Sequence, residues 1–130
     1  MQYTILLIED KTGLRDTLQS LLELHHYQVI TAANGQEGIQ LATAHLPNLV
    51  ISDIYMPVLN GYQLLEAFQA HEKLRNIPVI ILSARSAREE ITLALEKGAA
   101  AYINKPFLFA NLNANIRELL HTSGTATLNH

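Results

Sequence analysis

The sequence has no cysteine and no tryptophan, and it is poor in basic residues. Without cysteine the chain can form neither a disulfide nor a thiolate metal site, so nothing in it requires an oxidising compartment. With 9 lysines and arginines against 12 aspartates and glutamates, the net charge of -3 offers no basic field to a nucleic-acid backbone. No apolar run reaches the roughly 20 residues of a transmembrane helix, and the amino terminus lacks the basic region of a signal peptide. We therefore expect a cytoplasmic protein that binds neither nucleic acid directly nor a membrane.

Apolar residues are abundant enough for a core: hydrophobic residues make up 48% of the 130 positions, a length that suits one domain. Short β-branched runs alternate with longer segments in which apolar residues recur every three or four positions, which is typical of βα units. We expect five helices whose buried stripes include Ala42 with Leu46 and Ala94 with Leu95. The five expected strands are 4–8, 28–31, 49–52, 79–82 and 100–103.

The expected strands are apolar without strict alternation, which favours a sheet covered on both faces. Right-handed crossovers between consecutive parallel strands then predict an open, doubly wound α/β sheet with five strands and five helices. The helical period stops after His121. We therefore expect residues 1–121 to form the domain and 122–130 a flexible tail or the start of a linker.

Helix boundaries are indicated by local side-chain chemistry. Asn34 with Glu37, and Ser86 with Glu89, have the spacing at which an N-cap side chain and a third-position carboxylate satisfy free backbone donors. Gly98 after a helical segment predicts a helix end.

Polar residues follow the strands at the edge where such sheets bind ligands. Glu9 and Asp10 follow the first strand, Asp53 the third, Ser83 the fourth and Lys105 the fifth. Taken singly, each has an ordinary explanation as a solvated strand end or a residue that bonds its own backbone. Three carboxylates at one edge would repel one another, and a divalent cation relieves that repulsion. Oxygen ligands without histidine or cysteine favour Mg²⁺.

Lys105 directly precedes Pro106. A bond before proline is able to adopt the cis form, and it fixes the direction of the backbone at the strand end. A lysine held at this place is a point charge for a phosphate group.

Four segments together resemble the receiver domains of two-component response regulators: the acidic pair at 9 and 10, DIYMPVLNG at 53–61, Ser83 with Ala84, and AYINKPF at 101–107. The match covers nearly the whole chain, with each segment closing a βα unit. The resemblance implies a flavodoxin-like fold with strand order 2-1-3-4-5.

The resemblance also implies residue roles. Asp53 would be the phosphoacceptor, attacking a phosphohistidine of a histidine kinase or histidine phosphotransfer protein to form an acyl phosphate. Mg²⁺ would be held by the carboxylates of Glu9, Asp10 and Asp53 and by the backbone carbonyl of Tyr55. Lys105 would contact a phosphoryl oxygen.

The signal would leave the site through Ser83, whose hydroxyl would bond the phosphoryl group, and through Tyr102, which would turn inward behind it. The responding surface would comprise the helix 86–97, the strand 100–103 and the helix near 112–120. The downstream partner is either another protein or an effector domain beyond this sequence, and homodimerisation through this surface is a further option within the family.

Some positions depart from the commonest family pattern. Serine replaces threonine at Ser83, and Leu108 stands where a polar helix cap is usual. Tyr55 and Arg85 occupy positions that tune water access in the family.

Two other functions stay open. One is a receiver-like interaction module that never carries phosphate. The other is a phosphohydrolase with Asp53 as nucleophile, which would want a second aspartate where Tyr55 stands. We expect a switch that is a reactant in its own phosphorylation and dephosphorylation, and no conventional enzyme.

Overall fold

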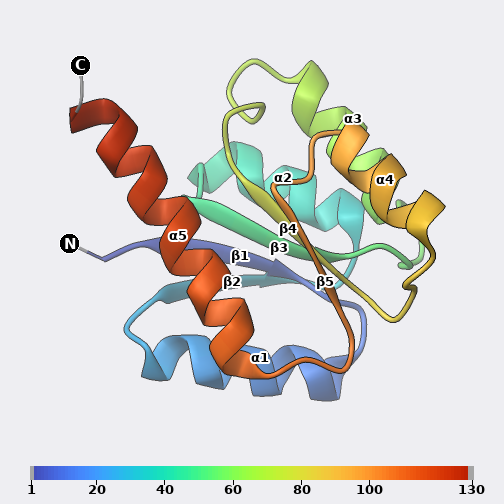
Figure 1. Ribbon diagram of the computed structural model, residues 1–130, viewed down its shortest axis with the longest axis horizontal. Coiled ribbons are helices and arrows are strands. Elements are labelled where there is room, and N and C mark those ends of the chain that lie inside the picture. The colour runs from blue at the N-terminus through green and yellow to red at the C-terminus, as the bar shows by residue number, and fades with distance from the viewer. Residues whose placement is uncertain (1, 129–130) are drawn as a thin grey trace.

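Strands and helices alternate along the chain (Figure 1). The computed structural model describes the backbone of residues 2–128 and the side chains of residues 2–121. The strands are β1 (Thr4–Ile8), β2 (Gln28–Ala32), β3 (Leu49–Asp53), β4 (Val79–Ser83) and β5 (Ala101–Asn104). The helices are α1 (Thr12–Leu24), α2 (Gly35–His45), α3 (Gly61–Ala70), α4 (Arg88–Glu96) and α5 (Phe109–Leu128).

The strands form one sheet in the order β2-β1-β3-β4-β5, and every neighbouring pair is parallel. This confirms the expected doubly wound α/β architecture and its strand order. In register, Asp53 of β3 lies opposite Leu82 of β4, and Ser83 of β4 lies opposite Asn104 of β5. The polar residues at the strand ends therefore meet along one edge of the sheet.

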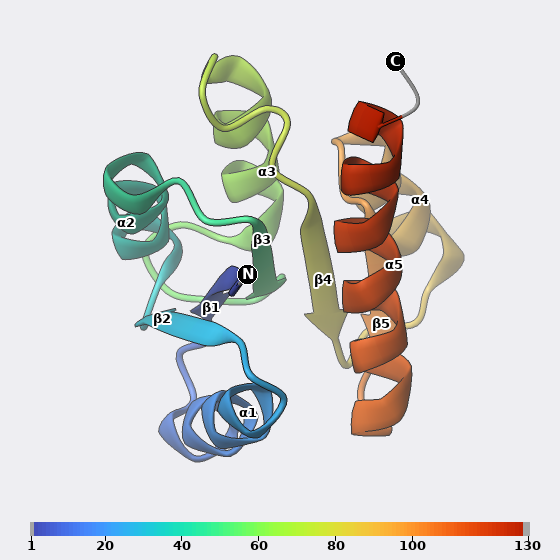
Figure 2. The ribbon, with the colours of Figure 1, turned by 90° about the vertical axis from the view of Figure 1, so that its left-hand side faces the viewer.

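Both faces of the sheet are buried, because alternate strand residues enter two separate cores. In β1, Leu6 and Ile8 pack on the side of α2, α3 and α4, whereas Ile5 and Leu7 pack on the side of α1 and α5. Figure 1 shows these two helical layers, and Figure 2 shows α2 and α3 side by side. Each buried leucine or isoleucine contributes about 1.5–3 kcal/mol, which explains the continuous apolar runs.

Two of the three predicted helix boundaries are confirmed. The Asn34 side chain accepts from the Glu37 N–H at 2.9 Å, and Gly98 ends α4 with a φ of 109°. The predicted cap at Ser86 is wrong: α4 has its N-cap at Ala87, without a side-chain hydrogen bond. There the chain uses main-chain bonds alone, with the N–H groups of residues 90 and 91 donating to the Ala87 carbonyl.

Two leucines expected in buried helical stripes are exposed. Leu46 and Leu95 each expose 48% of their surface. Leu46 lies beyond the end of α2 in a left-handed conformation with a φ of 48°, which takes it off the helical stripe. On α4, the small Ala94 is fully buried and its neighbour Leu95 points outward. The helix therefore presents an apolar side chain to solvent.

The last helix extends further than the sequence period indicates. The α5 backbone stays helical to Leu128, seven residues past the expected domain boundary at His121, and the assignment of 122–130 to a tail or a linker stays a prediction. Extending an existing helix costs far less than starting one, so α5 continues past its apolar stripe. Residues 129–130 of the expected tail lie outside the described residues. Although α5 has 20 residues, none of the helices described here is apolar over a stretch long enough to cross a bilayer.

Candidate functional site

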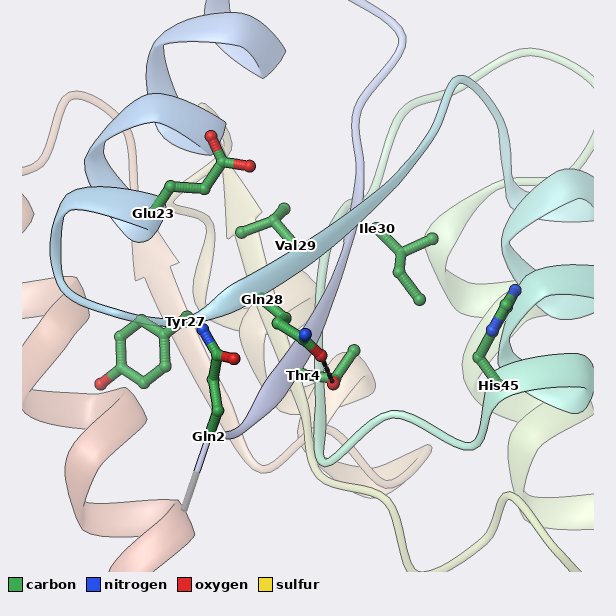
Figure 3. Close-up of a pocket in the computed structure, with 8 residues that line it drawn as sticks. All are labelled: Gln2, Thr4, Glu23, Tyr27, Gln28, Val29, Ile30 and His45. Atoms are coloured by element: carbon green, nitrogen blue, oxygen red, sulfur yellow. Dashed lines mark hydrogen bonds between the residues drawn. The ribbon is translucent and has the colours of Figure 1, made fainter.

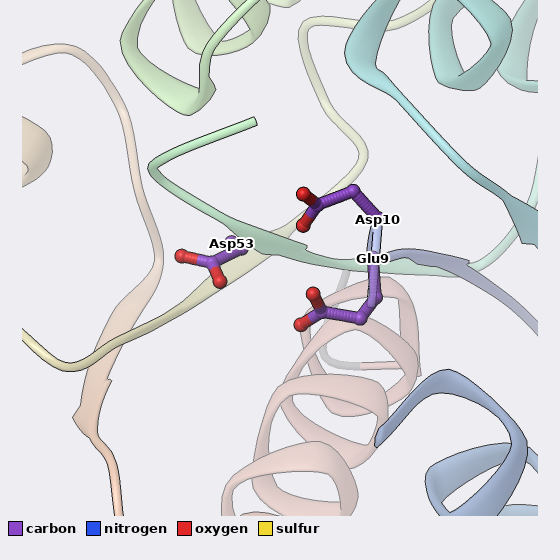
Figure 4. Close-up of side chains that lie close together, drawn as sticks. All are labelled: Glu9, Asp10 and Asp53. Atoms are coloured by element: carbon purple, nitrogen blue, oxygen red, sulfur yellow. The ribbon is translucent and has the colours of Figure 1, made fainter. Parts of the chain in front are cut away.

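Three carboxylates converge at the carboxyl edge of the sheet. Glu9 and Asp10 follow β1, and Asp53 is the last residue of the adjacent strand β3. One carboxylate oxygen from each lies within 4.8 Å of the others. Figure 4 shows the carboxylates of Glu9 and Asp10 extending from the end of β1 toward Asp53. The expected acidic cluster is thus present in the folded chain.

Asp53 is held by the backbone that follows it. The residue is only 7% exposed, and its Oδ1 accepts from the N–H groups of Ile54 at 2.6 Å and Tyr55 at 3.3 Å. The start of α3 crosses this loop closely, since a Cβ on Gly61 would lie 2.7 Å from the Asp53 carbonyl oxygen. The glycine is therefore required for the loop to close behind Asp53.

Lys105 joins two of the carboxylates. Its Nζ donates to Asp53 Oδ2 at 2.7 Å and to Glu9 Oε1 at 3.2 Å. In the sequence, Lys105 comes directly after the last residue of β5. Its backbone N–H donates to the Ser83 carbonyl at 2.8 Å, and the Lys105–Pro106 bond is cis. Lys105 therefore reaches the acidic cluster from the β5 side of the sheet, whereas Glu9 and Asp10 reach it from β1.

For both Glu9 and Lys105, burial and the neighbouring opposite charge shift the pKa in opposite directions. Burial raises the pKa of Glu9 above 4.5, against the lowering effects of its Lys11 backbone hydrogen bond and the Lys105 charge. For Lys105, burial acts to lower the pKa, but the hydrogen bond and charge of Asp53, together with Glu9, raise it above 10.5. Lys105 is thus fully protonated at neutral pH.

Asp10 places a buried carboxylate oxygen in the acidic cluster. Its Oδ1 is buried and has no hydrogen-bond partner among the described residues. A buried carboxylate oxygen left without a partner is costly, and here it lies beside two further carboxylates. An all-oxygen donor set of this kind fits a hard divalent cation.

The two residues expected to carry the signal meet at Arg85. Ser83 is fully buried, and its Oγ accepts from the Arg85 N–H at 3.1 Å. The half-buried Tyr102 donates its hydroxyl to the Arg85 carbonyl at 2.8 Å. Ser83 and Tyr102 are therefore linked through one backbone unit of the loop after β4.

One contact of this region was not predicted. Glu90 in the first turn of α4 accepts from the Tyr55 hydroxyl at 2.8 Å through its Oε1. The Arg85 guanidinium lies 5.0 Å from the centroid of the Tyr55 ring. No local sequence pattern marks a pair 35 residues apart, so this link is visible only in the folded chain.

A separate pocket lies at the other end of the sheet. It includes Thr4 and Gln28, the first residues of β1 and β2, whose side chains are joined by a 3.2 Å hydrogen bond (Figure 3). Glu23 and His45 also line it, and they come from two different helices. The acidic cluster is therefore distinct from this pocket.

The comparisons with known proteins agree with this geometry. The family model of the response regulator receiver domain matches residues 5–117. The chain belongs to the receiver domain family. Such domains are signalling switches of two-component systems and act with histidine kinases or phosphotransfer proteins.

Among relatives of this receiver domain, the transcriptional regulatory protein PrrA of Mycobacterium tuberculosis is 37% identical over 124 residues. These residues cover 95% of this chain but 52% of PrrA, so the chain spans about half of that relative.

Solved receiver structures share the fold. The CheY-like protein of Methanospirillum hungatei JF-1 superposes with a TM-score of 0.89 at 30% identity, covering 97% of this chain and 99% of that one. The receiver domain of the sensor histidine kinase PA1611 of Pseudomonas aeruginosa PAO1 has a TM-score of 0.86 at 26% identity, over 93% of this chain and 99% of its own. That domain holds a magnesium ion in its active-site cleft.

Proposed function

We propose that this receiver domain is a cytoplasmic switch that is activated when Asp53 accepts a phosphoryl group from a phosphohistidine. The donor is a sensor kinase or a histidine phosphotransfer protein. One observation carries the proposal: the buried Asp53 carboxylate lies 2.7 Å from the Lys105 ammonium and beside two further carboxylates. This arrangement joins a candidate nucleophile to a fixed positive charge and a candidate cation site.

The transfer needs little proton chemistry from the protein. A carboxylate oxygen of Asp53 attacks phosphorus, a P–O bond forms, and the bond between phosphorus and the donor imidazole nitrogen breaks. Lys105 places its positive charge beside Asp53 before attack and pairs with a phosphoryl oxygen afterwards. Hydrolysis by water returns the Asp53 carboxylate and inorganic phosphate.

Mg²⁺ fits the donor atoms present. The carboxylates of Glu9, Asp10 and Asp53 and the backbone carbonyl of Tyr55 would hold it, and the cation would be a partner for the buried Asp10 Oδ1. The magnesium ion in the PA1611 receiver domain supports this assignment. When bound, the metal neutralises charge on the transferring phosphoryl group.

The response would begin at Ser83. A phosphoryl oxygen that bonds its hydroxyl disturbs the bond to the Arg85 N–H, and Tyr102 is tied to the same residue. The disturbance thus reaches β5 and the loop that leads into α4. On α4 itself, Leu93 and Leu95 are 40% and 48% exposed. These apolar side chains on the α4–β5–α5 surface are suited to a downstream protein or effector domain, or to a second copy.

The donor protein would dock beside Lys105. An apolar hollow between α1 and the segment after β5 is lined by Lys105 itself and by Leu14, Leu18, Phe107 and Phe109. A donor that presents its phosphohistidine to Asp53 must approach this edge of the sheet. The hollow offers it apolar contact area next to the reacting atoms.

Intact-mass analysis after incubation with acetyl phosphate and Mg²⁺ tests the proposal. We expect the gain of one phosphoryl mass, and its loss with EDTA or in Asp53→Asn. Asp16→Asn is the matched control, because Asp16 lies exposed on α1 and the substitution removes the same charge. If acetyl phosphate, a phosphohistidine donor and beryllofluoride all fail on the wild type, a phosphate-independent interaction module becomes the better explanation.

A further inference from the structure

Tyr55 is a half-exposed side chain that is held at two points. It exposes 46% of its surface, which would ordinarily leave a surface tyrosine free to rotate. Its hydroxyl instead donates to Glu90 Oε1 at 2.8 Å, and the Arg85 guanidinium lies 5.0 Å from the ring centroid. A cation over an aromatic face and a charge-assisted hydrogen bond both oppose rotation of the ring.

The held ring lies between the two loops that form the phosphorylation site. The backbone N–H of Tyr55 donates to Asp53 Oδ1, and that of Arg85 donates to Ser83 Oγ. Because β3 and β4 are neighbours in the sheet, the contact between Tyr55 and Arg85 bridges the loops beyond both strands. The contact therefore lies beside the site, between two residues whose backbone N–H groups bond Asp53 and Ser83.

Glu90 is itself fixed. Its backbone carbonyl accepts from the Tyr62 hydroxyl at 3.4 Å, and its Oε2 is buried without a hydrogen-bond partner among the described residues. A carboxylate that is partly withdrawn from water is a stronger acceptor for the one donor it has. Among the described side chains, the Tyr55 hydroxyl is the one that donates to the Glu90 carboxylate.

We propose that Glu90 is a positioning residue: through the Tyr55 hydroxyl it holds the ring across the site and slows the entry of water to phosphorylated Asp53. The inference rests on the proposed function. Water oxygen attacks phosphorus, the bond to the Asp53 oxygen breaks, and inorganic phosphate leaves. Glu90 touches none of these atoms and acts only by limiting their access to water.

The lifetime of the aspartyl phosphate tests this role. Each variant is phosphorylated with acetyl phosphate and Mg²⁺, the donor is removed, and the loss of phosphoryl mass is followed with time. Loss of a hydrogen bond of ordinary strength predicts a lifetime about three- to tenfold shorter in Glu90→Ala and in Tyr55→Phe. Glu90→Gln keeps a carbonyl acceptor and is expected to restore a nearly normal lifetime.

A neighbouring glutamate supplies the matched control. Glu89→Ala removes the same charge from the same turn of α4 at an exposed position, and its lifetime should equal that of the wild type. Because Glu90 acts through the Tyr55 hydroxyl, Glu90→Ala should add nothing in the Tyr55→Phe background. Effects that multiply in the double variant, or a Glu89→Ala lifetime as short as that of Glu90→Ala, would overturn the inference.

A second measurement reports the position of the Tyr55 ring in the unphosphorylated protein. The Tyr55 ring should shift the side-chain proton resonances of Arg85, and Glu90→Ala should reduce that shift while Glu89→Ala leaves it unchanged. Unchanged Arg85 resonances in Glu90→Ala would refute the positioning of the ring. If the wild type forms no phosphoryl adduct at all, the proposed function fails, and the role of Glu90 in water entry fails with it. If the adduct forms but has the same lifetime in Glu90→Ala as in the wild type, this inference is overturned and the proposed function is not.

Discussion

Replacement of Asp10 by asparagine should stabilise the metal-free protein. Asp10 faces Glu9 and Asp53 with carboxylate oxygens within 4.8 Å, and among the described residues Lys105 is the cation that forms salt bridges with these two. Two unit charges at that distance repel by about 0.9 kcal/mol in water and about 3.5 kcal/mol at an effective dielectric of about 20. Since one net negative charge remains opposite Asp10, the substitution should raise the free energy of unfolding by about 1–3 kcal/mol.

Thermal unfolding in EDTA and in Mg²⁺ measures this effect. For a chain of this length, about 1–3 kcal/mol corresponds to a melting temperature about 4–12 °C higher in EDTA. Mg²⁺ at 100 times its dissociation constant should stabilise the wild type by about 2.7 kcal/mol. Asp10→Asn should lose most of that gain because a carboxylate ligand is gone.

Asp16→Asn controls for the change in net charge, and it should follow the wild type in both media. The reasoning fails if Asp10→Asn melts at or below the wild-type temperature in EDTA. It fails equally if Mg²⁺ stabilises the variant as strongly as the wild type.

Three further predictions concern the same edge of the sheet. Lys105→Met leaves Glu9 and Asp53 facing each other and should lower the free energy of unfolding by up to about 3 kcal/mol at pH 7; an unchanged urea midpoint would contradict the ion pair. The raised pKa of Glu9 means that its native carboxyl keeps a proton to higher pH than the unfolded one, so its contribution to stability falls as pH rises from about 4.5. Glu9→Gln should therefore gain stability relative to wild type between about pH 4.5 and 7 in EDTA, and a flat difference in urea titrations would refute this. Gly61→Ala should cost about 1–3 kcal/mol because its Cβ meets the Asp53 carbonyl at 2.7 Å, whereas Gly13→Ala, with nothing within 4 Å, should gain about 0.5–1 kcal/mol; chemical unfolding of both variants checks the contrast.

The fold and the acidic cluster were predictable because both depend on short-range patterns. Apolar runs fix the strands, and the rule that ligands bind at the carboxyl ends of parallel strands brings Glu9, Asp53 and Lys105 to one edge. The expected strand 4–8 agrees with β1, and the expected start of β5 is off by one residue.

The missed features depend on contacts that no local pattern records. The buried stripe of α4 contains Ala94 and excludes its neighbour Leu95, which points about 100° further round the helix and is 48% exposed. Glu90 looks like an ordinary first-turn acidic residue until the fold brings Tyr55 to it. The cap at Ser86 was wrong because main-chain bonds take its place. The roles assigned to the site residues remain predictions.

The placement of Lys105 has a consequence for newly made protein. Its partner Glu9 lies 96 residues earlier in the chain, and β5 is the last strand to be synthesised. A nascent chain that has released β1 to β4 from the ribosome already carries Asp53 and its neighbouring carboxylates, but it lacks the cation that balances them. Under the proposed function, phosphorylation would then require that β5 has docked, and a kinase would pass its signal only to folded copies.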